Sequence, residues 1–267
     1  MRSPTSDLTV GQALALGALH GPAELLPVSS SAHTSVIPWL LGWRYSDLDP
    51  DLQKSFEVAL HAGTAIGVIP RLRELDRRGA LITALASLPP AAAGLAFERK
   101  IERRLGTPGT IAAALLTGAV VMALADRRPQ DRSRADARAS DGLWLGVAQA
   151  CALVPGISRA GATLSAARFL RFRPADARLL SDQAALPVLA GASLLKAVRL
   201  RRRGLDRHDA TAFVAGAGAS LVSTLALIAR SRRGAALQRL SPYAGYRAAL
   251  AGAILIRLRR DSTAPRS

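Results

Sequence analysis

Two short stretches, each interrupted by a proline, carry most of the residues that could do chemistry. The first, "HGPAELLPVSSSAH", runs from His20 to His33 and contains Glu24 and three consecutive serines. His20 and Glu24 are four residues apart, so on a helix they share a face and could act as two ligands to a cation or as a base and its partner. A carboxylate, a hydroxyl nucleophile such as Ser30 and the His33 imidazole beside an arginine-lined anion site would form a phosphoryl-transfer centre. The alternative is that the three serines form a polar loop with a capping role.

The second stretch, "LVPGISRAGAT" at 153–163, has the properties of an anion site. Its Pro-Gly pair stops a helix, its second glycine lets the backbone approach a ligand, and the next helical run presents unpaired N–H groups and a positive dipole end. Two hydroxyls add donors, and the arginine adds a planar fork that suits phosphate. The alternative is a helix break with a snorkelling arginine. The residues in question are Gly156, Ser158, Arg159, Gly161 and Thr163.

Apolar segments with few or no charges must position these stretches. They are rich in Ala, Leu, Val and Gly, short arginine-rich runs separate them, and they cover 56–70, 79–97, 109–125, 142–157, 183–195, 211–229 and 244–256. Apolar blocks between basic loops predict an all-α, polytopic membrane helical bundle. The net charge of +17 raises the alternative of a soluble bundle with a basic, nucleic-acid-binding face. Because 109–125 and 211–229 carry no charge on any helix face, we favour the lipid bilayer and expect no nucleic-acid partner.

Many of these segments are shorter than the roughly 20 residues that a helix needs to cross the bilayer core. Either arginines at their ends extend them by snorkelling, or some are half-helices that enter the membrane and turn back. Backbone broken at membrane depth is tolerated where protein or a water-filled cavity satisfies it. The sequence therefore predicts re-entrant helix–loop segments at the two proline-interrupted stretches.

The two stretches also resemble one another. Leu16–Ser35 and Leu145–Ser165 each begin with Leu-Gly, place a polar residue three positions later, and reach a Pro-x-x-Ser pattern that aligns Ser30 with Ser158. Paired, Pro/Gly-interrupted segments in corresponding halves indicate a substrate site at the interface of inverted repeats. We therefore expect one membrane domain over 1–267. It would consist of repeat 1 at about 8–125, an exposed linker at 126–141 and repeat 2 at about 142–258.

Together, "HGPAELLPVSSSAH" and "PGISRAGAT" resemble the motifs of the undecaprenyl-diphosphate phosphatases, integral membrane enzymes associated with bacitracin resistance. That family has Glu/Gln-x-x-x-Glu followed by Leu-Pro-x-Ser-Ser-x-x-His, and later Pro-Gly-x-Ser-Arg-Ser-x-x-Thr. Other segments look like family segments in the expected order, so the resemblance covers nearly the whole chain. These are "FEVALHAGTAIGVI" (56–69), "LPPAAAGL" (88–95), "LPVLAGASLL" (186–195) and "YRAALAGAIL" (246–255).

The resemblance implies a multi-pass protein of the bacterial plasma membrane that removes the terminal phosphate of a polyprenyl diphosphate and so recycles the lipid carrier for cell-wall synthesis. It implies that Glu24 is the essential acid, Ser30 the nucleophile and His33 a proton-transfer partner. A divalent cation, Mg²⁺ or Ca²⁺, would bind at Glu24 and His20, and a homodimer is left open. The diphosphate would be held by Arg159, Ser158 and Thr163, with Gly156 and Gly161 shaping the loop.

Three positions depart from the family pattern. His20 stands where the family has Glu or Gln, His61 stands where glutamine is usual, and Ala160 replaces the second serine of Ser-Arg-Ser. The segment "LLSDQ" (179–183) also replaces an aromatic Phe-Ser-Phe run. A neutral imidazole can bind a metal, but Mg²⁺ prefers oxygen ligands. The identity of the metal is therefore the feature that these departures leave open.

Two rival functions need separating from hydrolysis. Inverted repeats around an anion site also suit a transporter that flips a polyprenyl phosphate without cleaving it. Phosphate release from a diphosphate lipid distinguishes the two. The acid-phosphatase-like lipid phosphatases combine Ser-Arg with a distant histidine, and here no histidine follows Arg159 before His208, which disfavours them.

Overall fold

The computed structural model describes residues 8–201, 207–231 and 239–263, and within these ranges the protein is helical, with one isolated β-bridge. The predicted all-α class is confirmed. Parts of the basic runs 199–203 and 230–233, and both ends of the predicted 1–267 domain, lie outside the described residues. The α-helices are α1 (Val10–Leu25), α2 (Ser30–Leu40), α3 (Pro50–Val68), α4 (Arg77–Leu105), α5 (Pro108–Asp126), α6 (Ala139–Cys151), α7 (Arg159–Phe169), α8 (Pro174–Arg201), α9 (Arg207–Ser231) and α10 (Ser241–Thr263). Short 3₁₀ helices η1 (Arg44–Asp47), η2 (Ile69–Glu74) and η3 (Arg134–Asp136) connect some of them.

Local sequence signals explain where several helices begin. Thr9 caps α1 in a capping box with Gln12, each side chain accepting from the other residue's backbone N–H at 3.2–3.3 Å. The Thr107 side chain caps α5 by accepting from the Thr110 N–H, and Pro108 takes the first helical position, where its missing N–H costs no hydrogen bond. These starts are therefore encoded by neighbouring residues and need no tertiary contact.

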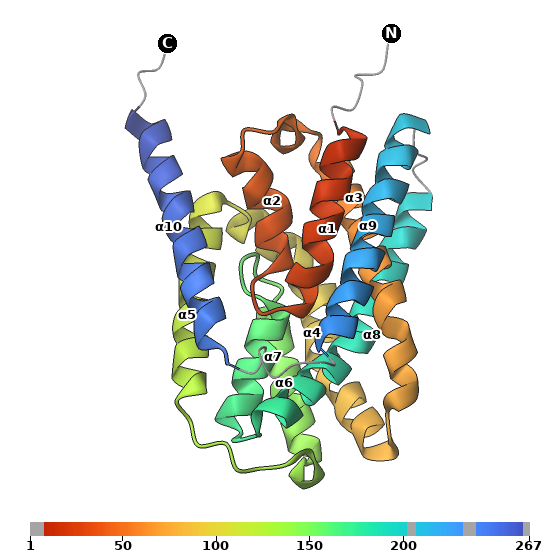
Figure 1. Cartoon of the computed structure of the whole chain (residues 1–267), viewed down its shortest axis with the longest axis vertical. Helices are drawn as coiled ribbons and strands as arrows, with labels where there is room; N and C mark the ends of the chain where they lie inside the picture. Colours follow the sequence, from red (N-terminus) through yellow and green to blue (C-terminus); the bar gives the residue numbers. More distant parts are fainter. Residues whose placement is uncertain (1–7, 202–206, 232–238, 264–267) are drawn as a thin grey trace.

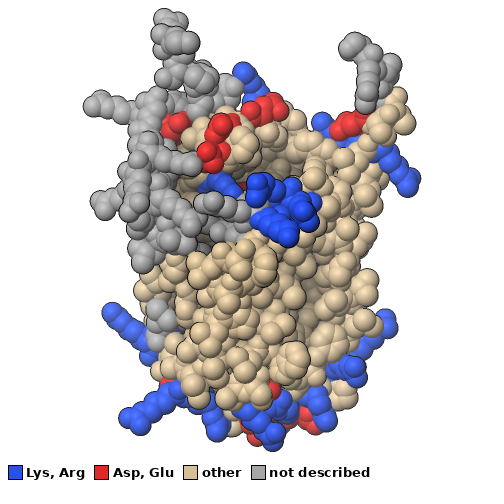
Figure 2. Space-filling model, turned by 180° about the vertical axis from the view of Figure 1, so that it is seen from behind, with Lys and Arg blue, Asp and Glu red and all other residues tan. Residues whose placement is uncertain are grey.

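Among the residues that the structure describes, three helices are long and apolar enough to cross a membrane. They cover Arg77–Phe97 in α4, Pro108–Asp126 in α5 and Asp209–Arg230 in α9, which match three of the apolar segments predicted from sequence. Large apolar side chains on them face outward, with Leu95 85% and Val214 72% exposed. Figure 2 shows a broad belt without charged side chains across the middle of one face, with basic side chains above and below it. This distribution fits a protein whose middle contacts hydrocarbon.

Two helical hairpins meet in the interior. Figure 1 shows α1 descending from the end of the molecule where α10 finishes, and α2 returning toward that end. The α6–α7 hairpin approaches from the opposite end, so that the two connecting loops lie close together near the middle. A hydrogen bond joins the loop between α6 and α7 to the start of α2, from the Gly156 N–H to the Ser31 hydroxyl at 3.4 Å. The remaining helices surround both hairpins, with α5 packed against α10 on one flank and α3 packed against both α8 and α9 on the other.

Glycines allow the hairpins to pack against backbone. A Cβ on Gly17 of α1 would lie 2.2 Å from the carbonyl oxygen of Gly216 in α9, and one on Gly63 of α3 would lie 2.1 Å from that of Ala217. Gly146 of α6 approaches the Ala86 carbonyl of α4 in a similar way, where a Cβ would lie at 2.9 Å. Small residues at helix crossings let backbones approach closely, which is how helices pack in membranes.

The connection between α5 and α6, predicted as an exposed linker, is anchored to the rest of the protein. Arg132 pairs with the buried Asp141 of α6 at 2.8 Å, and its guanidinium lies over the ring of Phe172 at 4.3 Å. Within the exposed part, the Ser133 backbone N–H donates to Asp136 and lowers the pKa of that carboxyl. The segment is therefore a structured corner of the molecule.

Replacing Gly17 with alanine is expected to destabilise the protein by about 1–3 kcal/mol, because the new methyl group would overlap the α9 backbone. Thermal unfolding of the purified protein in detergent measures this change. Gly218→Ala in α9 is the matched control, since nothing lies within 4 Å of its added Cβ and alanine favours a helix. Equal unfolding temperatures for the two variants would contradict the close packing of α1 on α9.

Candidate active site

The site forms where the two helix breaks meet. The first break lies between α1 and α2, and Ser29 adopts the left-handed region there with φ 78° while its side chain caps α2. The second break contains Gly156 with φ 97°, a conformation that favours glycine, and a Cβ there would also lie 2.7 Å from the Ile111 carbonyl oxygen. These breaks bring the end of α1 against the start of α7.

Glu24, the penultimate residue of α1, is the centre of the site and is only 6% exposed. The Ser30 hydroxyl donates to its Oε2 at 2.5 Å. Arg159, the first residue of α7, donates to the other carboxylate oxygen at 3.4 Å and to the Glu24 backbone carbonyl at 2.8 Å. A buried carboxylate is thus held between a hydroxyl and a guanidinium that come from opposite hairpins.

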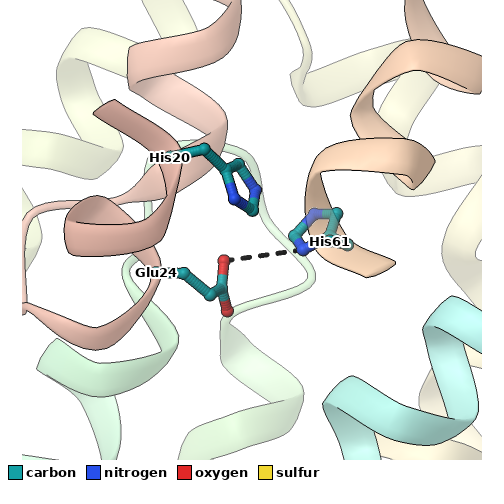
Figure 3. Close-up of side chains that lie close together, drawn as sticks. All are labelled: His20, Glu24 and His61. Atoms are coloured by element: carbon teal, nitrogen blue, oxygen red, sulfur yellow. Dashed lines mark ion pairs between the residues drawn. The ribbon is translucent and has the colours of Figure 1, made fainter. Parts of the chain in front are cut away.

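Two histidines face the same carboxylate. Figure 3 shows His20 from α1 and His61 from α3 beside Glu24, with His61 Nδ1 lying 3.7 Å from Glu24 Oε2. The two imidazole rings pack edge to face with centroids 4.5 Å apart. One potential ligand atom from each of the three residues lies within 4.8 Å of the others. The predicted metal pair of His20 and Glu24 is therefore joined by His61, which sequence reasoning had noted only as a departure from the family pattern.

His33 lies on α2, and both its ring nitrogens are engaged. Nδ1 lies 2.7 Å from the Ser29 carbonyl oxygen, so it carries the proton and donates it, while Nε2 accepts from the Tyr246 hydroxyl at 2.7 Å. The Tyr246 ring stacks on the imidazole with centroids 5.6 Å apart. Tyr246, a residue of α10 that was not predicted, is 43% exposed and fixes the orientation of the His33 ring through this hydrogen bond and stack.

The other residues predicted to bind the diphosphate lie around Arg159. Ser158 caps α7 by accepting from the Gly161 N–H at 3.2 Å, and its hydroxyl points to the Leu26 carbonyl at 3.5 Å. Thr163 is fully buried, donates to the Arg159 carbonyl and lies 2.6 Å from the Ser181 hydroxyl. These hydroxyls hold the loop and the start of α7 in place, and Arg159 is the group of this set that contacts Glu24.

Arg247 supports the second break and was missed. It lies on α10, is 1% exposed, and donates to the carbonyls of Ala114, Leu115 and Gly156 at 3.0–3.3 Å. Gly118 on α5 leaves room for its guanidinium. The available signal was an arginine inside the apolar segment 244–256, because charged residues in such segments generally have a dedicated partner.

The structure corrects the register of the two breaks. Ser29 and Ser158 are the corresponding N-caps, so Ser158 pairs with Ser29 and not with Ser30. The same separation of 129 positions relates His20 to Gln149, Gly17 to Gly146 and Thr34 to Thr163. The proline lies two residues before the N-cap in the first break and three before it in the second. Aligning the two stretches on Pro-x-x-Ser therefore shifts the pairing by one residue.

These features define an all-helical protein with a buried acid, hydroxyl and guanidinium between two helix breaks. The chain belongs to the bacitracin resistance protein family: the family model described as "Bacitracin resistance protein BacA" matches residues 13–253. An undecaprenyl-diphosphatase of Geobacter sulfurreducens is 35% identical over 93% of this chain and 98% of its own length. The enzymes of the same name from Geobacter metallireducens and Pelobacter propionicus are 36% and 33% identical, over 90% and 91% of the chain and 95% of their own lengths.

Replacing Arg247 with methionine is expected to lower stability by about 1–3 kcal/mol, because the Gly156 carbonyl would lose its buried donor. Thermal unfolding in detergent tests this. Arg257→Met on the same helix is the control. Arg257 also donates to a backbone carbonyl, that of Leu40, but its side chain is 37% exposed, so water can replace the lost donor. If both variants unfold at the same temperature, Arg247 does not hold the second break.

Proposed function

We propose that this chain hydrolyses undecaprenyl diphosphate to undecaprenyl phosphate and inorganic phosphate, which returns the lipid carrier to cell-wall synthesis. The named activity of relatives that align over almost the whole chain supports this assignment. The structural observation that carries it is the 2.5 Å hydrogen bond from the Ser30 hydroxyl to the buried Glu24, beside Arg159. A hydroxyl bonded to a carboxylate next to a guanidinium is suited to attack on phosphorus.

In the proposed first step, Ser30 Oγ attacks the terminal phosphorus and passes its proton to Glu24. The bond between that phosphorus and the bridging oxygen breaks, and undecaprenyl phosphate leaves with the bonding electrons. Arg159 and the N–H groups at the start of α7 stabilise the charge that develops on the phosphoryl oxygens. Water then attacks the phosphoserine phosphorus and the bond to Ser30 Oγ breaks. Ser30 takes back the proton that Glu24 holds, and the protons of the water leave with the released phosphate.

The supporting groups keep this arrangement in place. Because Arg159 also donates to the Glu24 backbone carbonyl, it holds the end of α1 in contact with the start of α7. His33 is assigned to proton transfer, and its ring is held by the Ser29 carbonyl at Nδ1 and by the Tyr246 hydroxyl at Nε2. Placing reacting groups in this way lowers the entropic part of a barrier.

The donor set does not fit the Mg²⁺ or Ca²⁺ expected for the family. Both ions prefer carboxylate, carbonyl and water oxygens, whereas the cluster beside Ser30 offers two imidazoles and one carboxylate. The proposed steps therefore use only groups of this chain.

We also propose that the protein is a multi-pass protein of the bacterial plasma membrane built from two inverted repeats with re-entrant hairpins. In support, α1–α2 and α6–α7 approach from opposite ends and carry corresponding residues 129 positions apart. Five α-helices precede the 127–138 connection and five follow it among the described residues. Equivalent contacts also recur, since α1 packs on α9 as α6 packs on α4.

Purified protein in detergent is expected to release phosphate from undecaprenyl diphosphate, and Ser30→Ala should lower that rate by about 10²-fold or more because it removes the nucleophile. Ser31→Ala is the matched control, since the Ser31 hydroxyl lies near the Gly156 N–H and Ser29 and not at Glu24. Equal losses in the two variants would make the serines a capping element. A parent protein that moves the lipid across vesicles but releases no phosphate would be a transporter.

Replacing Arg159 with lysine is expected to reduce turnover almost as much as alanine does, by about 10²-fold. Lysine keeps the charge but lacks the planar fork that reaches the Glu24 carboxylate and carbonyl together. Phosphate release under saturating substrate measures the effect, and circular dichroism checks that the helices form. Near-parental turnover in the lysine variant would show that a point charge is sufficient.

A further inference from the structure

The cluster of His20, Glu24 and His61 has the geometry of a three-ligand metal site. His20 and Glu24 are one helical turn apart on α1, and His61 faces them from α3 (Figure 3). The 3.7 Å between His61 Nδ1 and Glu24 Oε2 is close to the separation of two ligands that each bind one ion at about 2.0–2.2 Å. The third ligand atom lies within 4.8 Å of both, so a small side-chain adjustment would close the site.

Buried hydroxyls behind His20 set its tautomer. The Ser220 hydroxyl donates to the Leu60 carbonyl at 2.9 Å, which leaves its oxygen as an acceptor. Thr64 lies closer to Ser220, at 2.9 Å, than to His20, at 3.2 Å, so we assign its proton to Ser220. His20 Nδ1, within 3.2–3.3 Å of both hydroxyl oxygens, then donates, and Nε2 keeps its lone pair. Metal-binding histidines are oriented in this way by a hydrogen bond at the second ring nitrogen.

The donor types select the cation. Imidazole nitrogens suit zinc, cobalt, iron and nickel, whereas Mg²⁺ and Ca²⁺ bind sites built from oxygen. Two histidines and one carboxylate are also a common protein ligand set of catalytic zinc, which leaves a position for water or substrate. Arg159 already pairs with Glu24, so a bound divalent cation would leave the site with a net positive charge that matches a diphosphate.

We propose that His20, Glu24 and His61 bind a divalent transition-metal cation such as Zn²⁺ in preference to Mg²⁺ or Ca²⁺. The proposal deepens the proposed function because the cation would lie beside Ser30 and the phosphate that it attacks. Binding of the cation itself needs no substrate and is measured separately from hydrolysis.

The test uses the full-length protein in detergent, stripped with a chelator and then loaded with Co²⁺ alone as a spectroscopic probe. The parent is expected to bind one Co²⁺ per chain with visible absorption bands, and Zn²⁺ should displace it while a large excess of Mg²⁺ does not. The double variant His20→Glu, His61→Gln restores the family's donor types and should bind Co²⁺ at least 10²-fold more weakly. Ser220→Ala should weaken binding by about 10-fold, because it removes one of the two hydroxyl acceptors behind His20.

His33→Gln is the control, since it removes a buried histidine outside the cluster and should leave the Co²⁺ bands unchanged. Should the double variant fold poorly, His61→Gln alone gives the same test at a side chain that is 28% exposed. The proposal is overturned if the parent binds no Co²⁺, or if the cluster variants bind it as tightly as the parent. Phosphate release by protein that binds no Co²⁺ would still support the proposed hydrolysis. Co²⁺ binding without phosphate release would contradict the proposed hydrolysis and leave the metal site supported.

Discussion

The structure depends on one buried carboxylate. An isolated charge buried in protein costs several kcal/mol, so Glu24 is stable only while its partners stay in place. Ser30 reaches it from α2 and Arg159 reaches it from α7, across the meeting point of two separate hairpins. The same contact that lowers the cost of burying Glu24 therefore also joins the hairpins and brings the chemical groups together.

The helices around this contact make it rigid. Glycines let α1 lie directly against the backbone of α9 and let α6 lie against α4, so each hairpin is fixed on one side by a helix from the other half of the chain. Arg247 adds a third support by tying α10 and α5 to the second break. A site supported in this way can keep atomic positions that catalysis requires, because packed backbones leave little room for adjustment.

The sequence predicted the parts of this arrangement that local chemistry determines. Apolar length gave the three candidate membrane spans, and the prolines located both breaks. The meeting of Glu24 with Arg159 followed from comparing two similar stretches. Contacts that depend on tertiary packing were not predictable: Tyr246 and Arg247 come from α10, more than 80 residues beyond Arg159, and although the arginine stands out in an apolar segment, the sequence does not say which groups it binds. The N-cap register was also wrong, because a backbone conformation such as that of Ser29 leaves no simple trace in a row of three serines.

The corrected register gives the two breaks different roles. Arg159 lies 129 positions after Ser30, and the apolar Leu153 lies 129 positions after Glu24. Where the first stretch has a hydroxyl, the second therefore has a guanidinium, and where the first has an acid, the second has a hydrocarbon side chain. Each half of the chain has a hairpin packed on a helix of the other half, yet each half holds only part of the chemistry. Neither half would be a catalyst alone, and a homodimer of one half would lack either the acid or the guanidinium. Because the reactive groups are divided between the two stretches in this way, the two halves of the chain could not be separated or exchanged without losing one of these groups.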